Sequence, residues 1–220
     1  TQGTGVNFAW AQILRIATMH RMLDMYGALP YSQISSDKLS TPYDTMEEAY
    51  HAMFTDLTDA INVMTVYVTE NPNNRTMAKY DKVYDGDFEK WVKFANSLKL
   101  RMAIRIRFAD REYARQMAEE AINHSIGVIT SNEDNATSLG TKNQLYTVLV
   151  QWPDQCVSAD ITSYMKGYND PRMSKYFKKK TSDKGDDDYV GMRAGLSYGN
   201  DITGPTFSRI NVGEMDRTLW

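Results

Sequence analysis

Apolar residues recur at steps of three and four along four segments of the first 127 residues, and this period constrains the fold more than any other feature. Such a pattern places the apolar side chains on one face of an α-helix. The four segments cover residues 6–26, 46–64, 88–106 and 113–122. Because each expected helix is apolar on one face only, it has to bury that face against a neighbour. The sequence therefore predicts a mainly α protein.

Residues suited to helix ends mark the limits of these segments. Gly27 follows the first helix and easily adopts the left-handed turn that closes one. Thr45 and Glu48 have the spacing at which each side chain satisfies a backbone N–H of the other at a helix start. Asp110 is suited to cap the last helix, which we expect to close near Gly127. The tight turn before that helix predicts a helical hairpin.

Long segments with apolar residues at helical spacing end at residue 127, and turn-forming residues become common after it. The run 146–152 is strand-like, 157–167 and 172–177 favour short helices, and 178–188 is a charged loop before a tail rich in Gly, Asn and Ser. We expect residues 1–127 to form a helical-repeat scaffold. Residues 128–220 are expected to form a loop-rich, ligand-facing region with little β structure. Both belong to one unit in this interpretation.

Composition excludes several functions. Lys and Arg number 25 against 28 Asp and Glu, a net charge of −3, which does not suit a general nucleic-acid binder. No apolar run approaches the roughly 20 residues of a membrane-spanning helix. The single cysteine, Cys156, excludes an internal disulfide framework and any multi-cysteine metal site.

Catalytic and metal-binding patterns do not assemble in this sequence. His20, His51 and His124 lie in expected helices without partners at metal-ligand spacing, and the hydrolase and nucleotide-binding glycine motifs are absent. An enzyme is therefore the weakest hypothesis. No cofactor is expected.

One acidic run offers oxygen ligands of the kind that calcium prefers. It consists of Asp183, Asp186, Asp187 and Asp188. The run lacks the alternating spacing and the terminal glutamate of an EF-hand loop, so we favour a solvated charged loop.

Aromatic residues in expected loops suggest a binding surface. They are Tyr31, Tyr43, Tyr146, Trp152, Tyr189, Tyr198 and Trp220. An exposed ring offers an apolar face to sugar C–H groups, and nearby polar side chains can bind hydroxyls. We select three stacking platforms and three hydroxyl partners: Trp152, Tyr189, Tyr198, Asn143, Asp154 and Asn200. The alternative for each ring, that it anchors a loop onto the helices, stays open.

Five segments together resemble the SusD/RagB family of nutrient-binding outer-membrane lipoproteins. The strongest is Tyr84–Arg105, which begins Tyr-Asp-Gly-Asp-Phe-Glu-Lys-Trp. The others are Tyr26–Ser32, Thr41–Tyr50, Tyr164–Met173 and Tyr189–Leu196. The resemblance extends from about residue 6 to about residue 200 in the family's order.

This resemblance implies tetratricopeptide-like helical hairpins and a non-enzymatic role. Family members are lipid-anchored at the bacterial outer membrane of Bacteroidetes and pass nutrients to a SusC-like TonB-dependent transporter. The anchor cysteine is not present in this chain, which looks like a piece of a longer protein. The family's ligand residues vary, so none is transferred. We expect an oligosaccharide ligand; the rivals are a peptide or other nutrient, or a helical-repeat protein–protein adaptor.

Overall fold

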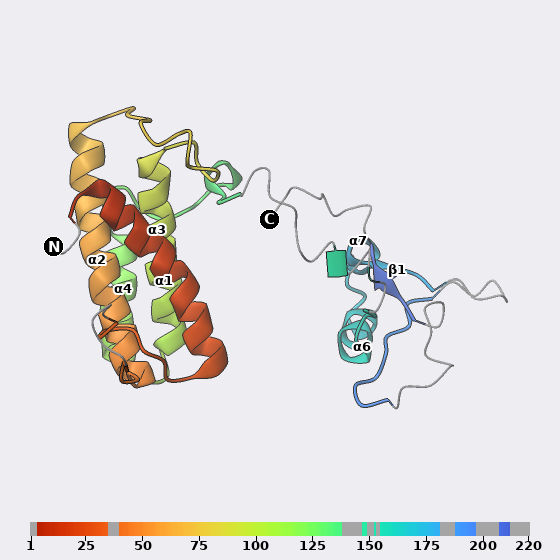
Figure 1. Ribbon diagram of the computed structural model, residues 1–220. Coiled ribbons are helices and arrows are strands. Elements are labelled where there is room, and N and C mark those ends of the chain that lie inside the picture. Colours follow the sequence, from red (N-terminus) through yellow and green to blue (C-terminus); the bar gives the residue numbers. More distant parts are fainter. Residues whose placement is uncertain are drawn as a thin grey trace. The chain divides into compact units, whose positions relative to one another are not determined.

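The computed structural model describes residues 4–34, 40–137, 147–148, 152, 155–180, 188–196 and 207–211. The chain divides into two compact units, Thr1–Ala136 and Thr137–Trp220. The described part is mainly helical with little β structure, which confirms the predicted fold class (Figure 1). Residues 128–136 are grouped with the helical unit, and the organisation as one scaffold with a ligand-facing region stays a prediction.

In its described residues the first unit has four long helices and a short 3-10 helix. They are α1 (Val6–Tyr26), α2 (Met46–Glu70), α3 (Phe88–Ile106), α4 (Arg111–Ile122) and η1 (Asn132–Asp134). Within this unit α1 packs against α2 and α3 packs against α4, while α2 and α3 join the two pairs. The long helices alternate in direction along the chain (Figure 1). This arrangement confirms the expected helical hairpins.

The predicted caps are present. Gly27 has φ 79° and its N–H donates to the carbonyl of Leu23 at 2.9 Å. Thr45 Oγ1 accepts from the N–H of Glu48, and the Glu48 carboxylate accepts from the N–H of Thr45 at 2.8 Å. Asp110 accepts from the N–H of Tyr113 at 3.1 Å. These bonds satisfy N–H groups that a helix leaves free at its start, so they fix where α2 and α4 begin.

An aromatic cluster on α3 holds the helices together. The ring of Trp91 meets Trp10, Tyr84 and Phe94 edge to face, with centroids 5.3 to 5.7 Å apart. Trp10 comes from α1, so the cluster links α1 to α3. Each large ring removes roughly 150–250 Å² from water, a gross gain of about 4–6 kcal/mol before entropy losses.

A buried carboxylate organises the connection between α2 and α3. Asp81 is buried and accepts from the backbone N–H groups of Val83, Tyr84 and Gly86 and from the indole N–H of Trp91, at 2.7 to 3.1 Å. Gly86 has φ 75°, and a Cβ there would lie 2.7 Å from the backbone nitrogen of Ala78. The segment that looks irregular in sequence is therefore an ordered turn structure.

A second aspartate organises the connection between α1 and α2. Asp44 accepts from the N–H groups of Tyr31 and Ser32 and from the Ser32 hydroxyl, at 2.6 to 2.8 Å. The Ser32 hydroxyl and N–H bonds hold the pKa of Asp44 below its usual value. Tyr31 is buried and its hydroxyl donates to Asp56 of α2 at 2.7 Å. For Tyr31 the alternative interpretation is correct, because this ring anchors a loop, whereas Tyr43 is exposed.

The second unit has short elements around a small apolar cluster. They are α6 (Ala159–Gly167), α7 (Met173–Tyr176), β1 (Phe177–Lys178) and β2 (Arg209–Ile210), with Phe177 opposite Ile210 in an antiparallel pair. The cluster consists of Val157, Met165, Met173 and Phe177, with Tyr189 packed against it. The two short helices were expected at 157–167 and 172–177, and the structure shortens both.

The strand-like interpretation of residues 146–152 is wrong where the structure describes that run. Thr147 and Val148 lie in a wide helical turn, and the N–H of Trp152 donates to the carbonyl of Thr147 at 3.0 Å. None of the described strands pairs with this segment. A run of β-branched residues needs such a pairing partner to become a strand.

Replacing Asp81 with alanine should destabilise the first unit. The change leaves the buried N–H of Trp91 and three backbone N–H groups without their acceptor, so we expect the free energy of unfolding to fall by about 3 kcal/mol. Urea unfolding followed by tryptophan fluorescence measures this. The matched control is Lys82→Ala, at an exposed neighbouring position, which should change stability by less than about 0.5 kcal/mol. Equal effects of the two substitutions would contradict this account of the turn.

Acidification should destabilise the first unit before its carboxylates titrate. Burial lowers the pKa of His20 below the value of an exposed histidine. It also lowers the pKa of His124, which is less completely buried. As the pH falls through about 6.5 the unfolded chain takes up protons that the folded chain resists, so stability decreases from pH 7.5 to 5.5. Melting temperatures across that window measure the slope. His20→Gln should make the slope shallower; an unchanged slope would exclude His20 as a source.

Candidate ligand-binding surface

A shallow hollow of about 600 Å³ lies on the second unit. It is bounded by the end of α6, the turn that follows, α7, and the segment at residues 188–189. Its lining residues are Met165, Lys166, Asn169, Asp170, Pro171, Met173, Ser174, Asp188 and Tyr189. The lining combines apolar and polar side chains, which is the usual composition of a small-molecule site.

Backbone hydrogen bonds place Tyr189 at this hollow. The N–H of Met192 donates to the carbonyl of Val157 at 2.7 Å, and the N–H of Ser208 donates to the carbonyl of Val190 at 2.7 Å. Between them, Gly191 lies so close to α6 that a Cβ would be 2.5 Å from the carbonyl oxygen of Ser158. The segment that carries Tyr189 is thus held by residues 157–158 and by Ser208.

The ring of Tyr189 is half-buried. One part packs on the apolar cluster of the second unit, and the ammonium of Lys179 lies 5.8 Å from the ring centroid. Because the ring is held by packing, its uncovered part is a rigid platform that loses little side-chain entropy on binding.

Ion pairs neutralise the charges of the hollow. Lys166 pairs with Asp188, and Arg172 pairs with Asp170. The Lys166 ammonium holds the pKa of Asp188 below its usual range, and hydrogen bonds from Arg172 lower the pKa of Asp170 to about 2. Both carboxylates that line the hollow are therefore ionised and paired near neutral pH. Each of these two carboxylates is thus compensated by a cationic partner.

Exposed aromatic rings lie on the elements that border this hollow. Tyr164 and Tyr168 are 69% and 82% exposed and lie four residues apart at the end of α6, so they share one face of that helix. Tyr176 of α7 is also exposed. Our sequence selection missed Tyr164 and Tyr176 because both lie in expected helices, and it passed over Tyr168 in the connection between those helices. The signal that could have found them is the four-residue spacing of two tyrosines beside polar residues.

Two of the six predicted site residues lie in the part of the chain that the structure describes. Trp152 is 59% exposed, and Tyr189 lines the hollow. Tyr198, Asn143, Asp154 and Asn200 lie outside the described residues.

Of the acidic run considered for calcium, Asp188 is described and pairs with Lys166. Asp183, Asp186 and Asp187 lie outside the described residues. Within the described ranges no group of three or more His, Cys, Asp or Glu side chains could hold a metal ion.

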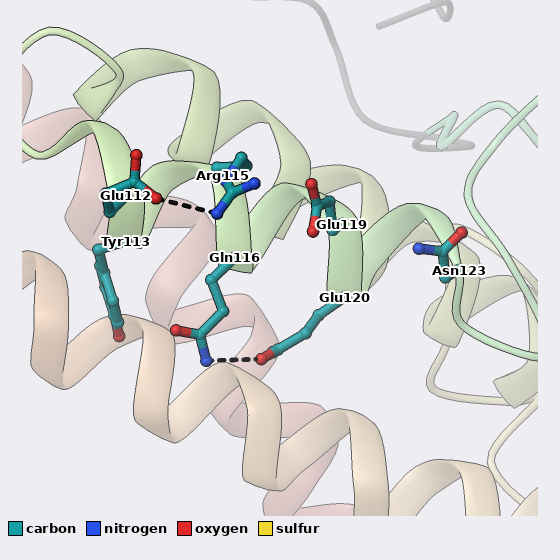
Figure 2. A pocket seen from close by; sticks show the side chains of 7 residues that line it. All are labelled: Glu112, Tyr113, Arg115, Gln116, Glu119, Glu120 and Asn123. Carbon is teal, nitrogen blue, oxygen red and sulfur yellow. Dashed lines mark hydrogen bonds and ion pairs between the residues drawn. The ribbon is translucent and has the colours of Figure 1, made fainter.

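The first unit has a hollow of about 640 Å³ along α4, and this one is a poor candidate for a ligand site. Figure 2 shows that its side chains all come from α4 and the residue that follows it, Asn123, and that two pairs of them interact with each other. The pairs are Glu112 with Arg115 and Gln116 with Glu120. A single helix face with internal pairs is typical of a solvated surface.

The first unit consists of helical hairpins and the second unit has an aromatic surface with paired charges, features that suit a binding scaffold, and comparisons with known proteins identify the family. The family model described as "Susd and RagB outer membrane lipoprotein" matches residues 1–220. The chain belongs to this SusD-like family. No match was found among curated protein sequences.

Solved structures agree with the family assignment. A SusD homolog from Bacteroides uniformis is 42% identical with a TM-score of 0.82; the match covers 98% of this chain and 45% of that one. A SusD-like protein from Bacteroides thetaiotaomicron is 36% identical with a TM-score of 0.84 and coverages of 98% and 44%. A chitin-binding SusD homolog from Flavobacterium johnsoniae is 33% identical with a TM-score of 0.85 and coverages of 97% and 44%. The chain thus spans less than half the length of these relatives.

The family is one of outer-membrane lipoproteins. Among the helices that the structure describes, none is both long enough and apolar enough to cross a membrane.

Substituting alanine for Gly191 should loosen the candidate surface. The added Cβ would meet backbone atoms of Ser158 and Ala159, so we expect a loss of about 1–3 kcal/mol in the second unit. Hydrogen exchange of peptides covering residues 157–192 should accelerate. Peptides from α1 to α4 serve as the internal control and should exchange as in the unchanged chain. Protection of residues 157–192 that survives the substitution would contradict the packing described for Gly191.

Proposed function

We propose that this chain is part of a cell-surface binding protein that captures an oligosaccharide and delivers it to a SusC-like TonB-dependent outer-membrane transporter. The observation that carries the proposal is the hollow of the second unit, which combines compensated charges with aromatic rings. Such a surface suits a neutral polyhydroxylated ligand. A charged nutrient would have to compete with ion pairs that are already formed.

Sugar recognition matches the chemistry of the side chains at this surface. The ring of Tyr189 offers an apolar face for C–H groups, while Asn169 and Ser174 offer hydrogen bonds to hydroxyls. We assign Trp152 as a second platform because its ring is exposed within the same unit. Tyr198, Asn143, Asp154 and Asn200 stay predictions for the same ligand.

Family membership supports binding over catalysis. The Flavobacterium johnsoniae relative, which is 33% identical to this chain, is described as chitin-binding. A protein of this family can therefore bind a glycan. We propose lipid anchoring at the outer membrane for the whole protein, in keeping with the family description. A shallow surface gives modest affinity; a millimolar Kd corresponds to about −4 kcal/mol. Modest affinity suits a protein that has to release its ligand to a transporter.

Calorimetric titration with neutral oligosaccharides tests this proposal. The panel should contain oligomers of N-acetylglucosamine and plant, host and microbial glycans. For a glycan that binds, Trp152→Ala and Tyr189→Ala should each weaken binding by about 1–3 kcal/mol, because each removes a stacking face, as in other aromatic stacking platforms.

Tyr80→Ala is the matched control, since Tyr80 is an exposed tyrosine of the first unit. It should leave the affinity unchanged. Circular dichroism confirms that each variant is folded. If the folded chain binds no glycan of the panel but binds peptides, the proposed ligand becomes a peptide nutrient in place of an oligosaccharide. If Tyr80→Ala weakened glycan binding as much as Trp152→Ala and Tyr189→Ala do, the assignment of the binding site to the second unit would be wrong.

A further inference from the structure

The longest helix of the chain has an unbalanced charge. Over its 25 residues α2 carries five carboxylates and no lysine or arginine. They are Glu47, Glu48, Asp56, Asp59 and Glu70. The first two lie in the first turn, where the helix dipole favours negative charge. The other three have no such explanation.

Part of this charge lies on an exposed stripe. Asp59, Val63, Val66 and Glu70 are all exposed and follow one another at steps of four, three and four, so they line one face of α2. Val66 is 56% exposed. The stripe thus has the order acid, apolar, apolar, acid over about three turns. We call these four residues the α2 stripe.

A groove between α1 and α2 adjoins the upstream end of the stripe. Its volume is about 230 Å³, and Phe8 and Gln12 of α1 face Asp56, Asp59 and Val63 of α2 across it. No lysine or arginine lines the groove. A lining that combines apolar side chains with carboxylates fits a long basic side chain, whose methylene groups can be buried while its charge is paired.

The cation nearest along α1 is engaged elsewhere. Arg15 donates to the side chain of Gln12 and to the carbonyl of Tyr31, and its guanidinium lies 4.1 Å from the centre of the Tyr31 ring. Among the described residues, Asp59 and Glu70 make no ion pair and no side-chain hydrogen bond. Their negative charges are therefore available to a partner.

Glu70 is also placed against the helix dipole. It is the last residue of α2, whose last turn contains no basic residue. A carboxylate at this negative end is destabilising unless a cation lies beside it. An arginine or lysine from outside the first unit would relieve that repulsion.

We propose that the α2 stripe and the adjoining groove are the docking site for a basic amphipathic helix of a partner protein. Charge complementarity and the spacing of the stripe identify this occupant. The partner helix carries arginine or lysine against Asp59 and Glu70, and leucine-sized residues between them against Val63 and Val66. The inference is independent of the proposed glycan binding.

A designed peptide tests the docking site. The probe is a fluorescein-labelled alanine-based helix with two arginines eleven positions apart and leucines four and seven positions after the first, the spacing of the stripe. A second probe has citrulline, which has the same shape without the charge, in place of both arginines. Fluorescence anisotropy should show the arginine peptide binding at least about tenfold more tightly than the citrulline peptide.

Two variants and one matched control locate the site on the chain. Asp59→Lys should weaken binding of the arginine peptide at least about tenfold, and Val66→Asn should weaken it about fivefold. The control is Glu119→Lys, which makes the same change of charge sign on exposed α4 at a residue that Figure 2 shows apart from the paired side chains. It should change the affinity by less than about twofold.

Several outcomes would overturn the proposal. They are absence of binding at the highest soluble peptide concentration, equal binding of both peptides, and equal effects of Asp59→Lys and Glu119→Lys. Light scattering of the chain alone, which measures its oligomeric state, provides a further test. If the chain forms a dimer that Asp59→Lys disrupts, a second copy of the chain occupies this face and the proposal is wrong. Because no glycan is used, failure here leaves the result of the calorimetric test unaffected.

Discussion

The packing of the first unit depends on one buried carboxylate. The connection from α2 to α3 has no regular secondary structure, so its backbone N–H groups need other acceptors inside the protein. Asp81 accepts three of them and also the indole N–H of Trp91, whose ring is the centre of the aromatic cluster. The same four bonds therefore shape the connection and orient the side chain through which α1 and α3 pack. A hydrophobic residue could fill the space but could not do both.

Periodicity and capping predicted most of the first unit, because both act over a few residues. Thr45 and Glu48 are three positions apart, and their reciprocal bonds follow from that spacing alone. The order of residues 71–87 did not follow, since it depends on an aspartate whose indole partner lies ten positions downstream. The strand prediction is wrong at Thr147 and Val148 for the related reason that strands need pairing partners, which a local pattern does not reveal.

The candidate site was less predictable than the fold. Tyr189 was identified from its loop context, but the ion pair between Lys166 and Asp188 joins residues 22 positions apart and is invisible in sequence. That pair gives the Asp188 carboxylate a cationic partner, and so favours a neutral ligand over a cation. Tyr164 was overlooked because it lies in an expected helix, whereas α6 leaves this side chain exposed.

The two surfaces differ in how they handle charge, and this difference separates their partners. The hollow of the second unit pairs its carboxylates internally, so binding there should depend little on salt, as expected when rings and hydroxyls supply the contacts. The α2 stripe leaves its carboxylates unpaired. Its interactions are screened over a Debye length of about 8 Å at physiological ionic strength, so docking there should weaken as salt rises. The two proposed ligands therefore differ in chemistry, because the hollow suits a neutral nutrient whereas the α2 stripe suits a basic protein segment.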